Sequence, residues 1–171
     1  MLALEPSMLP EGALLSRYRD NGAYTDCYVV DIDREVSQAD YIRAFYTTVP
    51  FKTERLILKW AISKPSTDEE AHLLAEAKTD KFAAWYVEAR EANQLLLSDF
   101  RDRTRSWLMA EAAEGATRLY FGSAVVPELD AETQERQLGK RFSLLLGFHR
   151  LYSQVLLSAA RRRLLRAGDT A

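Results

Sequence analysis

The spacing of hydrophobic residues changes three times along the chain, and these changes predict the order of its elements. Residues 23–33 are rich in β-branched and aromatic side chains, which indicates a strand. Alternation along it places on one face Tyr24, Asp26, Tyr28, Val30 and Ile32. Apolar residues then recur at helical spacing in 37–48, 52–63 and 67–78. We therefore expect one strand followed by three helices.

Two of these helices begin at capping residues. Thr67 is followed three residues later by Glu70, which is the spacing of a capping box, where each side chain bonds the backbone N–H of the other residue. Ser37 and Asp40 form a weaker version of the same pattern. Local chemistry thus predicts where both helices start.

The middle of the chain returns to strands. Four segments with strand character follow one another, and the joints between them are only two or three residues long. Such short joints favour hairpins, so we expect an antiparallel meander. Pro127 ends the last strand because proline cannot donate a hydrogen bond to the ladder. The predicted strands are 82–90, 94–100, 105–113, which begins within two residues of 105, and 117–127; the joints between them are 91–93, 101–102 and 114–116.

From about residue 131 to residue 166 the pattern is helical again. Apolar positions spaced by four and three residues form a continuous stripe, and between Phe142 and Leu157 the helix is apolar almost all round. About 25 ordered residues of such a helix extend roughly 38 Å, enough to cross a whole sheet. We expect this helix to pack against the apolar face of the strands.

This order of elements resembles the helix-grip fold of the START-related superfamily, which includes polyketide cyclase-like (SRPBCC) and lipid-transfer proteins. The resemblance is one of topology and covers residues 20–166. It implies an α+β fold in which a curved antiparallel sheet is wrapped around a long C-terminal helix, with two to three helices inserted after the first strand. It also implies a cavity between sheet and helix. Only five strands are evident, so we expect a smaller sheet and a shallower cavity.

Length and charge limit what the chain can be. Its 171 residues are expected to form a single domain, 1–171, with a flexible N-terminal arm at 1–12. The formal net charge of −2 gives no general attraction to nucleic acid or to anionic membranes. No stretch reaches the roughly 18 apolar residues of a membrane span, and the first residues lack a signal-peptide pattern. The cytoplasm is therefore the simplest location.

The sequence holds few groups for covalent or metal chemistry. Cys27 is the only cysteine, and His72 and His149 are the only histidines, so neither a disulfide nor a metal site is expected. We interpret Cys27 as a small buried thiol on a strand. Gly122 lies within a strand and is expected to mark a bulge or bend. No phosphate loop or nucleophile elbow is present, and no cofactor is expected.

Aromatic side chains on the predicted strands are the strongest local feature. Large rings with polar tips commonly line apolar pockets, where the ring packs and the tip orients a ligand, but they also fill ordinary cores. Both interpretations are open at this point. The aromatic candidates for ligand contacts are Tyr28, Trp85, Trp107 and Tyr120 on strands and Tyr152 on the last helix.

Arg105 and His149 complete the set of candidate ligand-binding residues. Arg105 shares a face with Trp107, because the two are two positions apart in one strand. If Arg105 is buried, it needs a carboxylate partner or an anionic ligand. His149 lies in the apolar stripe of the last helix, where it is either a hydrogen-bonded core residue or a group that contacts a ligand or moves a proton. Most other charged residues within the strands are expected on a solvated face.

These observations favour a protein that binds a small hydrophobic or amphipathic molecule between the sheet and the C-terminal helix. One alternative is a cyclase-type or hydrolase-type enzyme, in which His149 with Arg105 or a nearby carboxylate acts as the acid–base pair. Another is an interaction module with a filled core, which could form a homodimer through aromatics on its first helices. No nucleic-acid partner is expected.

Overall fold

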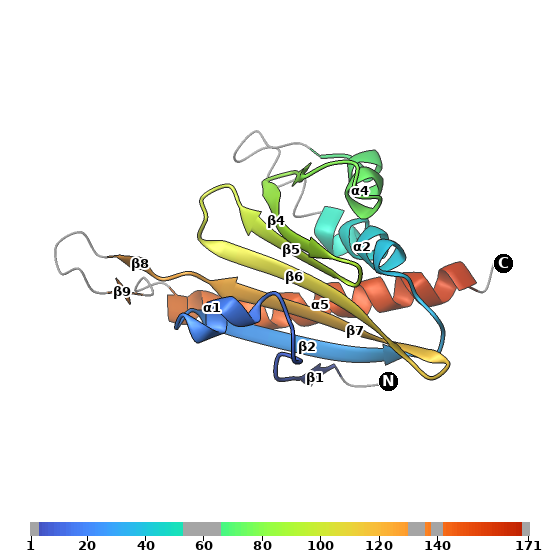
Figure 1. The fold of residues 1–171 in the computed structure, drawn as a ribbon, viewed down its shortest axis with the longest axis horizontal. Helices are drawn as coiled ribbons and strands as arrows, with labels where there is room; N and C mark the ends of the chain where they lie inside the picture. The colour runs from blue at the N-terminus through green and yellow to red at the C-terminus, as the bar shows by residue number, and fades with distance from the viewer. Residues whose placement is uncertain (1–3, 53–65, 130–135, 138–141, 169–171) are drawn as a thin grey trace.

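The computed structural model describes residues 4–52, 66–129, 136–137 and 142–168. Within these ranges the side chains are described as well, except in 128–151. Seven strands form one antiparallel sheet in the order β1-β2-β7-β6-β5-β4-β3 (Figure 1). The strands are β1 (Glu5–Pro6), β2 (Tyr24–Ile32), β3 (Lys81–Phe82), β4 (Trp85–Glu91), β5 (Gln94–Asp99), β6 (Thr104–Ala113) and β7 (Ala116–Val125).

Four helices, a further helical segment at 49–52 and a small hairpin accompany the sheet in the described part of the chain. The hairpin pairs β8 with β9 and precedes the last helix. In Figure 1, α1 lies in front of the sheet, whereas α5 runs along its back. These elements are α1 (Ser16–Asp20), α2 (Gln38–Tyr46), α4 (Asp68–Ala75), α5 (Phe142–Gly168), β8 (Glu128–Leu129) and β9 (Arg136–Gln137).

The arrangement is an α+β helix-grip fold, with helices inserted after the first long strand and a long helix at the end. The predicted first strand, the meander and the helices that start after Ser37 and Thr67 are confirmed. Both capping patterns form: Ser37 Oγ accepts from Asp40 N at 3.1 Å, and Thr67 and Glu70 make a reciprocal capping box. The helix predicted over 52–63 lies almost wholly outside the described residues.

The predicted start of the last helix and the predicted number of strands were wrong. The last helix begins at Phe142 rather than near residue 131, and Arg136–Gln137 is a strand. The apolar stripe explains this, because between 131 and 141 Leu138 is the only large apolar residue. The sheet also has seven strands rather than five, since β1 and β3 have two residues each and are too short to show a period.

The first residues pair with the sheet, which differs from the flexible arm expected for 1–12. Glu5 and Pro6 lie opposite Val29 and Tyr28 of β2, and Ser7 N donates to Cys27 O at 2.9 Å. The residues after Ser7 continue across the sheet, and among them Leu15 is fully buried. The described part of the N-terminal segment is therefore part of the fold.

Both faces of the sheet are buried, and each has its own apolar core. We call the face covered by α2, α4 and α5 the helix face; its core includes Val30, Ile32, Leu108, Leu119 and Phe121. We call the opposite face, covered by residues 9–18, the N-terminal face; its core includes Cys27, Leu96, Trp107, Met109, Tyr120 and Ala124. Helix α5 packs against α2, β2 and β7. No helix in the described residues is long and apolar enough to cross a bilayer.

Candidate functional site

A short polar row crosses the helix face of the sheet. Asp26 of β2 lies opposite Ser123 of β7, and Ser123 lies opposite Ser106 of β6. Because side chains alternate along a strand, these three residues share the face of Tyr28 and Phe121, which belong to the helix-face core. Three neighbouring strands thus place polar side chains at the same level of an otherwise apolar surface.

The hydroxyls of this polar row are buried, and each has a hydrogen-bond partner in the row or in α2. Ser123 is 3% exposed, and its backbone N and Oγ both donate to Asp26 Oδ1, at 3.1 and 2.5 Å. Ser106 is 8% exposed, and its Oγ lies 3.4 Å from the hydroxyl oxygen of Tyr46. Buried polar groups are costly unless they are hydrogen-bonded, so these contacts make the row tolerable in the core.

A group of aromatic rings packs on the same face of the sheet as the polar row. The ring centroid of Phe45 lies 4.9 Å from that of Phe121, and the centroid of Tyr46 lies 4.8 Å from Phe51 and 5.2 Å from Phe82. These rings join α2 and the residues after it to the sheet. Interior volume near α2 is therefore occupied by side chains of the protein itself.

Trp85 lies at the start of β4, directly opposite Phe82 of β3. Its half-buried ring packs against the helix-face core. Its indole Nε1 is buried and has no hydrogen-bond partner. A buried donor without an acceptor costs about 1–3 kcal/mol, so this group requires an explanation.

Six of the seven predicted site residues have described side chains, and these six are divided between the two faces. Tyr28 is buried in the helix-face core, and the half-buried Trp85 and Tyr152 pack against it. Arg105, Trp107 and Tyr120 point to the N-terminal face instead. His149 lies on α5, and its side chain is outside the described part of the structure. A single cavity between sheet and α5 cannot be lined by both sets, so Arg105, Trp107 and Tyr120 do not belong to it.

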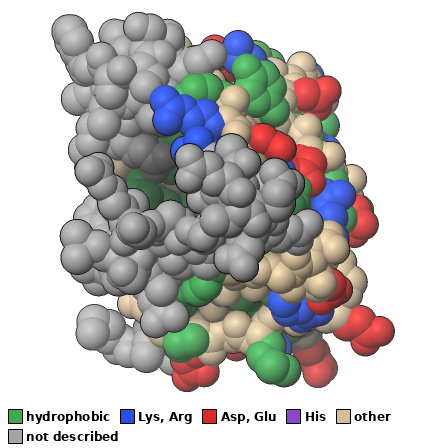
Figure 2. Space-filling model, turned by 90° about the vertical axis from the view of Figure 1, so that its left-hand side faces the viewer, with side chains coloured by type: hydrophobic (Ala, Val, Ile, Leu, Met, Phe, Trp, Pro, Cys, Tyr) green, Lys and Arg blue, Asp and Glu red, His purple; other side chains and the backbone are tan. Residues whose placement is uncertain are grey.

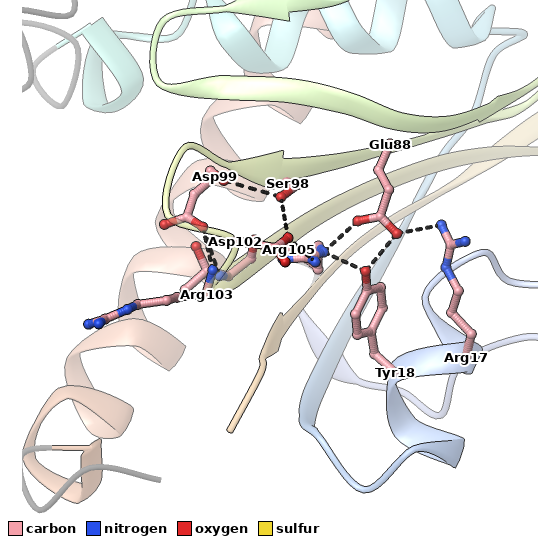
Figure 3. A network of polar contacts seen from close by, with 9 residues as sticks. Arg17, Tyr18, Glu88, Ser98, Asp99, Asp102, Arg103 and Arg105 are labelled. Atoms are coloured by element: carbon pink, nitrogen blue, oxygen red, sulfur yellow. Dashed lines mark hydrogen bonds and ion pairs between the residues drawn. The ribbon is translucent and has the colours of Figure 1, made fainter. Parts of the chain in front are cut away.

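Arg105 is the centre of a polar network that ties α1 to the sheet (Figure 3). Its side chain is 5% exposed, and its Nε donates to the Tyr18 hydroxyl at 2.6 Å and pairs with Glu88 Oε2 at 2.5 Å. Its Nη2 pairs with Asp102 Oδ1 at 2.5 Å. Tyr18 donates to Glu88 Oε1 at 2.6 Å, and Arg17 reaches the same oxygen at 2.7 Å. Arg105 therefore has the carboxylate partners that a buried guanidinium requires.

The charges and the burial of the network keep both Arg105 and Tyr18 protonated at neutral pH. Burial lowers the pKa of Arg105, but Tyr18, Glu88 and Asp102 together raise this pKa above its ordinary value. Burial and the hydrogen bond to Glu88 raise the pKa of Tyr18. Tyr18 thus stays protonated at neutral pH, when it both donates to Glu88 and accepts from Arg105. The arrangement suits a structural clasp, because its partners satisfy one another.

A β-bulge explains how Glu88 reaches this network. Val87 lies opposite Leu97 and Ala89 opposite Leu96, so Glu88 is the extra residue in β4. The bulge interrupts the alternation of side chains, because Glu88 and Ala89 both lie on the N-terminal face. Arg90 then turns to the helix face, where its Nη2 donates to Leu74 O near the end of α4 at 3.0 Å.

Trp107 is held beneath the N-terminal segment by Gln94. The Trp107 Nε1 donates to Gln94 Oε1 at 2.9 Å, and the same oxygen accepts from Leu14 N at 2.9 Å. Gly122 lies opposite Trp107 in β7, and a Cβ there would stand 3.0 Å from Trp107 Cε3 and 2.9 Å from Leu15 Cδ2. The strand pairing is continuous at Gly122, so it allows close packing and marks no bulge.

Cys27 is a buried thiol on β2, as predicted. Burial, with a smaller effect of Asp26, raises the pKa of the thiol to about 12. A thiol with such a pKa is not ionised near neutral pH, and only the thiolate is an effective nucleophile. Cys27 therefore serves packing.

Tyr120 lines a surface pocket of about 300 Å³ on the N-terminal face, at the edge formed by β1, β2 and β7. Its hydroxyl donates to Glu111 Oε2 at 3.0 Å. Arg118 and Asp31 form an exposed pair beside it, with 2.8 Å between Nε and Oδ1. Figure 2, which views the left-hand end of Figure 1, shows that the surface there also mixes side chains of both charges with hydrophobic ones. The pocket is lined by Glu5, Ser7, Val29, Val30, Asp31, Arg118 and Tyr120.

The sequence prediction missed the two serines of the polar row. Ser106 and Ser123 each lie two positions along the strand from a large apolar residue of the helix face, namely Leu108 and Phe121. Alternation alone therefore places a small hydroxyl on the core side of two adjacent strands, and this signal was available. Asp26 was expected among the charged residues of a solvated face, but it is half-buried and bonded to Ser123.

Comparison with known proteins finds solved structures that match most of the chain, but with low sequence identity and low TM-scores. No protein-family model matches this sequence, and no curated protein matches it. Ara h 8.0201 is 12% identical, with 84% of this chain and 99% of that chain covered and a TM-score of 0.38. CalU16 from Micromonospora echinospora is 11% identical, with 94% and 91% covered and a TM-score of 0.39. TTHA0849 from Thermus thermophilus is 12% identical, with 84% and 99% covered and a TM-score of 0.34.

Proposed function

We propose that this protein binds a small hydrophobic or amphipathic molecule between the helix face of the sheet and α5. The observation that carries the proposal is the polar row formed by Asp26, Ser123 and Ser106. Ligand pockets are mostly apolar surfaces with a few convergent polar groups that orient the ligand. A core that only had to be filled would gain nothing from two buried serines and a carboxylate on adjacent strands.

The residues assigned to this site are those that share its face. Tyr28, Trp85 and Tyr152 border the apolar surface, and the polar row supplies groups that can orient a polar end. His149 of α5 remains in the proposal as a contact from the helix. Membership of the START-related superfamily and a cytoplasmic location belong to the same proposal, with the order of elements and the sequence pattern as their support.

The test compares a filled polar row with a matched change on the other face. Ser106→Leu places a large side chain on the helix face, whereas Ser98→Leu makes the same change on the neighbouring strand β5, where Ser98 bonds Asp102 on the N-terminal face. Binding is followed with N-phenyl-1-naphthylamine, a neutral apolar molecule that fluoresces in apolar sites. We expect saturable binding to the wild type and to Ser98→Leu, and its loss in Ser106→Leu when circular dichroism shows a folded protein.

Two outcomes would overturn the proposal. Absence of saturable binding to the wild type would favour the interaction module, whose interior is filled by its own aromatic rings. Equal binding by wild type and Ser106→Leu would place the apolar site elsewhere on the molecule.

A further inference from the structure

The two tryptophans that the structure describes differ in how their indole N–H groups are satisfied. The Trp107 Nε1 donates to Gln94 Oε1 at 2.9 Å on the N-terminal face. The Trp85 Nε1 on the helix face is equally shielded from solvent but has no acceptor. The fold thus supplies a dedicated acceptor for one indole and leaves the other without one.

The unsatisfied group can act only as a donor. An indole nitrogen carries one N–H and accepts no hydrogen bond. Leaving it buried and unpaired is unfavourable, and a site of this kind discriminates strongly in favour of a ligand that can pair with it. A ligand that packs against Trp85 therefore gains affinity if it presents an acceptor to Nε1.

The strand opposite Trp85 indicates that this acceptor is uncharged. Asp99 of β5 is the direct cross-strand partner of Trp85, and its Oδ1 accepts from Arg103 N at 2.7 Å and Thr104 N at 3.1 Å. Directly paired residues have their Cβ atoms about 4.5–5.5 Å apart. The Asp99 side chain therefore shares a face with the Trp85 ring, and its carboxylate disfavours a ligand with an anionic group on that part of the face.

We propose that the ligand carries a neutral acceptor oxygen, such as a ketone, ester or ether oxygen, which accepts the hydrogen bond of Trp85 Nε1. This inference rests on the proposed binding function and defines the class of ligand for the same site. Trp85 is then a specificity-determining residue: it selects for the acceptor, while the apolar surface around it binds the body of the molecule.

Benzophenone and diphenylmethane test the inference, because they share one shape and differ in a carbonyl. Their dissociation constants are measured in the dark by equilibrium dialysis. We expect the wild type to bind benzophenone about tenfold more tightly, which one satisfied donor can supply. Trp85→Phe should reduce that preference to less than about threefold, and the test reads this ratio rather than the absolute affinity for diphenylmethane. Tyr86→Phe, which changes the exposed neighbouring ring, should keep the full preference.

The outcomes separate this inference from the function on which it rests. Equal binding of both compounds by the wild type would overturn the inference and leave apolar binding in place, with a buried water as the partner of Trp85. A preference that survives in Trp85→Phe would also overturn it. If neither compound binds but N-phenyl-1-naphthylamine does, the inference alone fails; if none of the three binds, the proposed function fails as well.

Discussion

Replacing Glu88 by glutamine tests whether the network around Arg105 is a structural clasp. The substitution keeps the size of the side chain but removes the charge that faces a guanidinium of 5% exposure. Removing one partner of a fully buried ion pair costs about 3–5 kcal/mol, whereas exposed pairs contribute about 0–1 kcal/mol. The Glu88 side chain is 23% exposed, and Asp102 remains beside Arg105 in the variant. We therefore expect the free energy of unfolding to fall by about 2 kcal/mol.

The matched control is Asp31→Asn, which removes the same kind of charge from an exposed pair. Arg118 and Asp31 have side chains that are 47% and 53% exposed, so this change should cost less than about 0.5 kcal/mol. Urea denaturation gives both free energies of unfolding, and thermal scans should show the Glu88 variant melting roughly 4–8 °C lower. Equal losses in the two variants, or no loss in Glu88→Gln, would refute the interpretation of this network as a clasp.

Two further predictions concern the packing of the N-terminal face. Gly122→Ala should destabilise the protein by about 1–3 kcal/mol, because the new Cβ meets Leu15, Trp107 and the backbone oxygen of Asp26 at 2.9–3.0 Å; an unchanged urea midpoint would show that this contact can relax. Burial raises the pKa of Cys27 from 9.0 to about 12, so its contribution to stability is fully present below pH 9 and is lost as the pH rises towards 12. Cys27→Ala should therefore flatten the fall in unfolding free energy over that range, and an identical pH profile in both proteins would contradict the assignment.

The outline of the fold could be predicted because it depends on near neighbours in sequence. The capping box at Thr67 forms as expected, since its two hydrogen bonds join residues only three positions apart. Short joints likewise determine hairpins, and the meander from β4 to β7 follows from them. The strands β1 and β3 could not be predicted, because two residues are too few to show a period and their pairing depends on distant partners.

The division of the candidate site between two faces required the tertiary structure. Period-two alternation shows that Arg105 and Trp107 share a face, but it does not show which element covers that face. In this protein both faces are buried, so an apolar or aromatic residue on a strand is compatible with either. The bulge at Glu88 also reverses the alternation within β4, and no local signal marks it.

The sequence by itself thus determined the kinds of elements, their order and which residues lie side by side on each strand, because these depend on propensity and local hydrogen bonds. Only the tertiary structure decided what each face contacts. Tyr18 reaches Glu88 across 70 residues, and Ser123 reaches Asp26 across 97. Contacts of such separation form only when the sheet has assembled, and they decide that Arg105 is satisfied by the protein while Trp85 is left with a donor to offer.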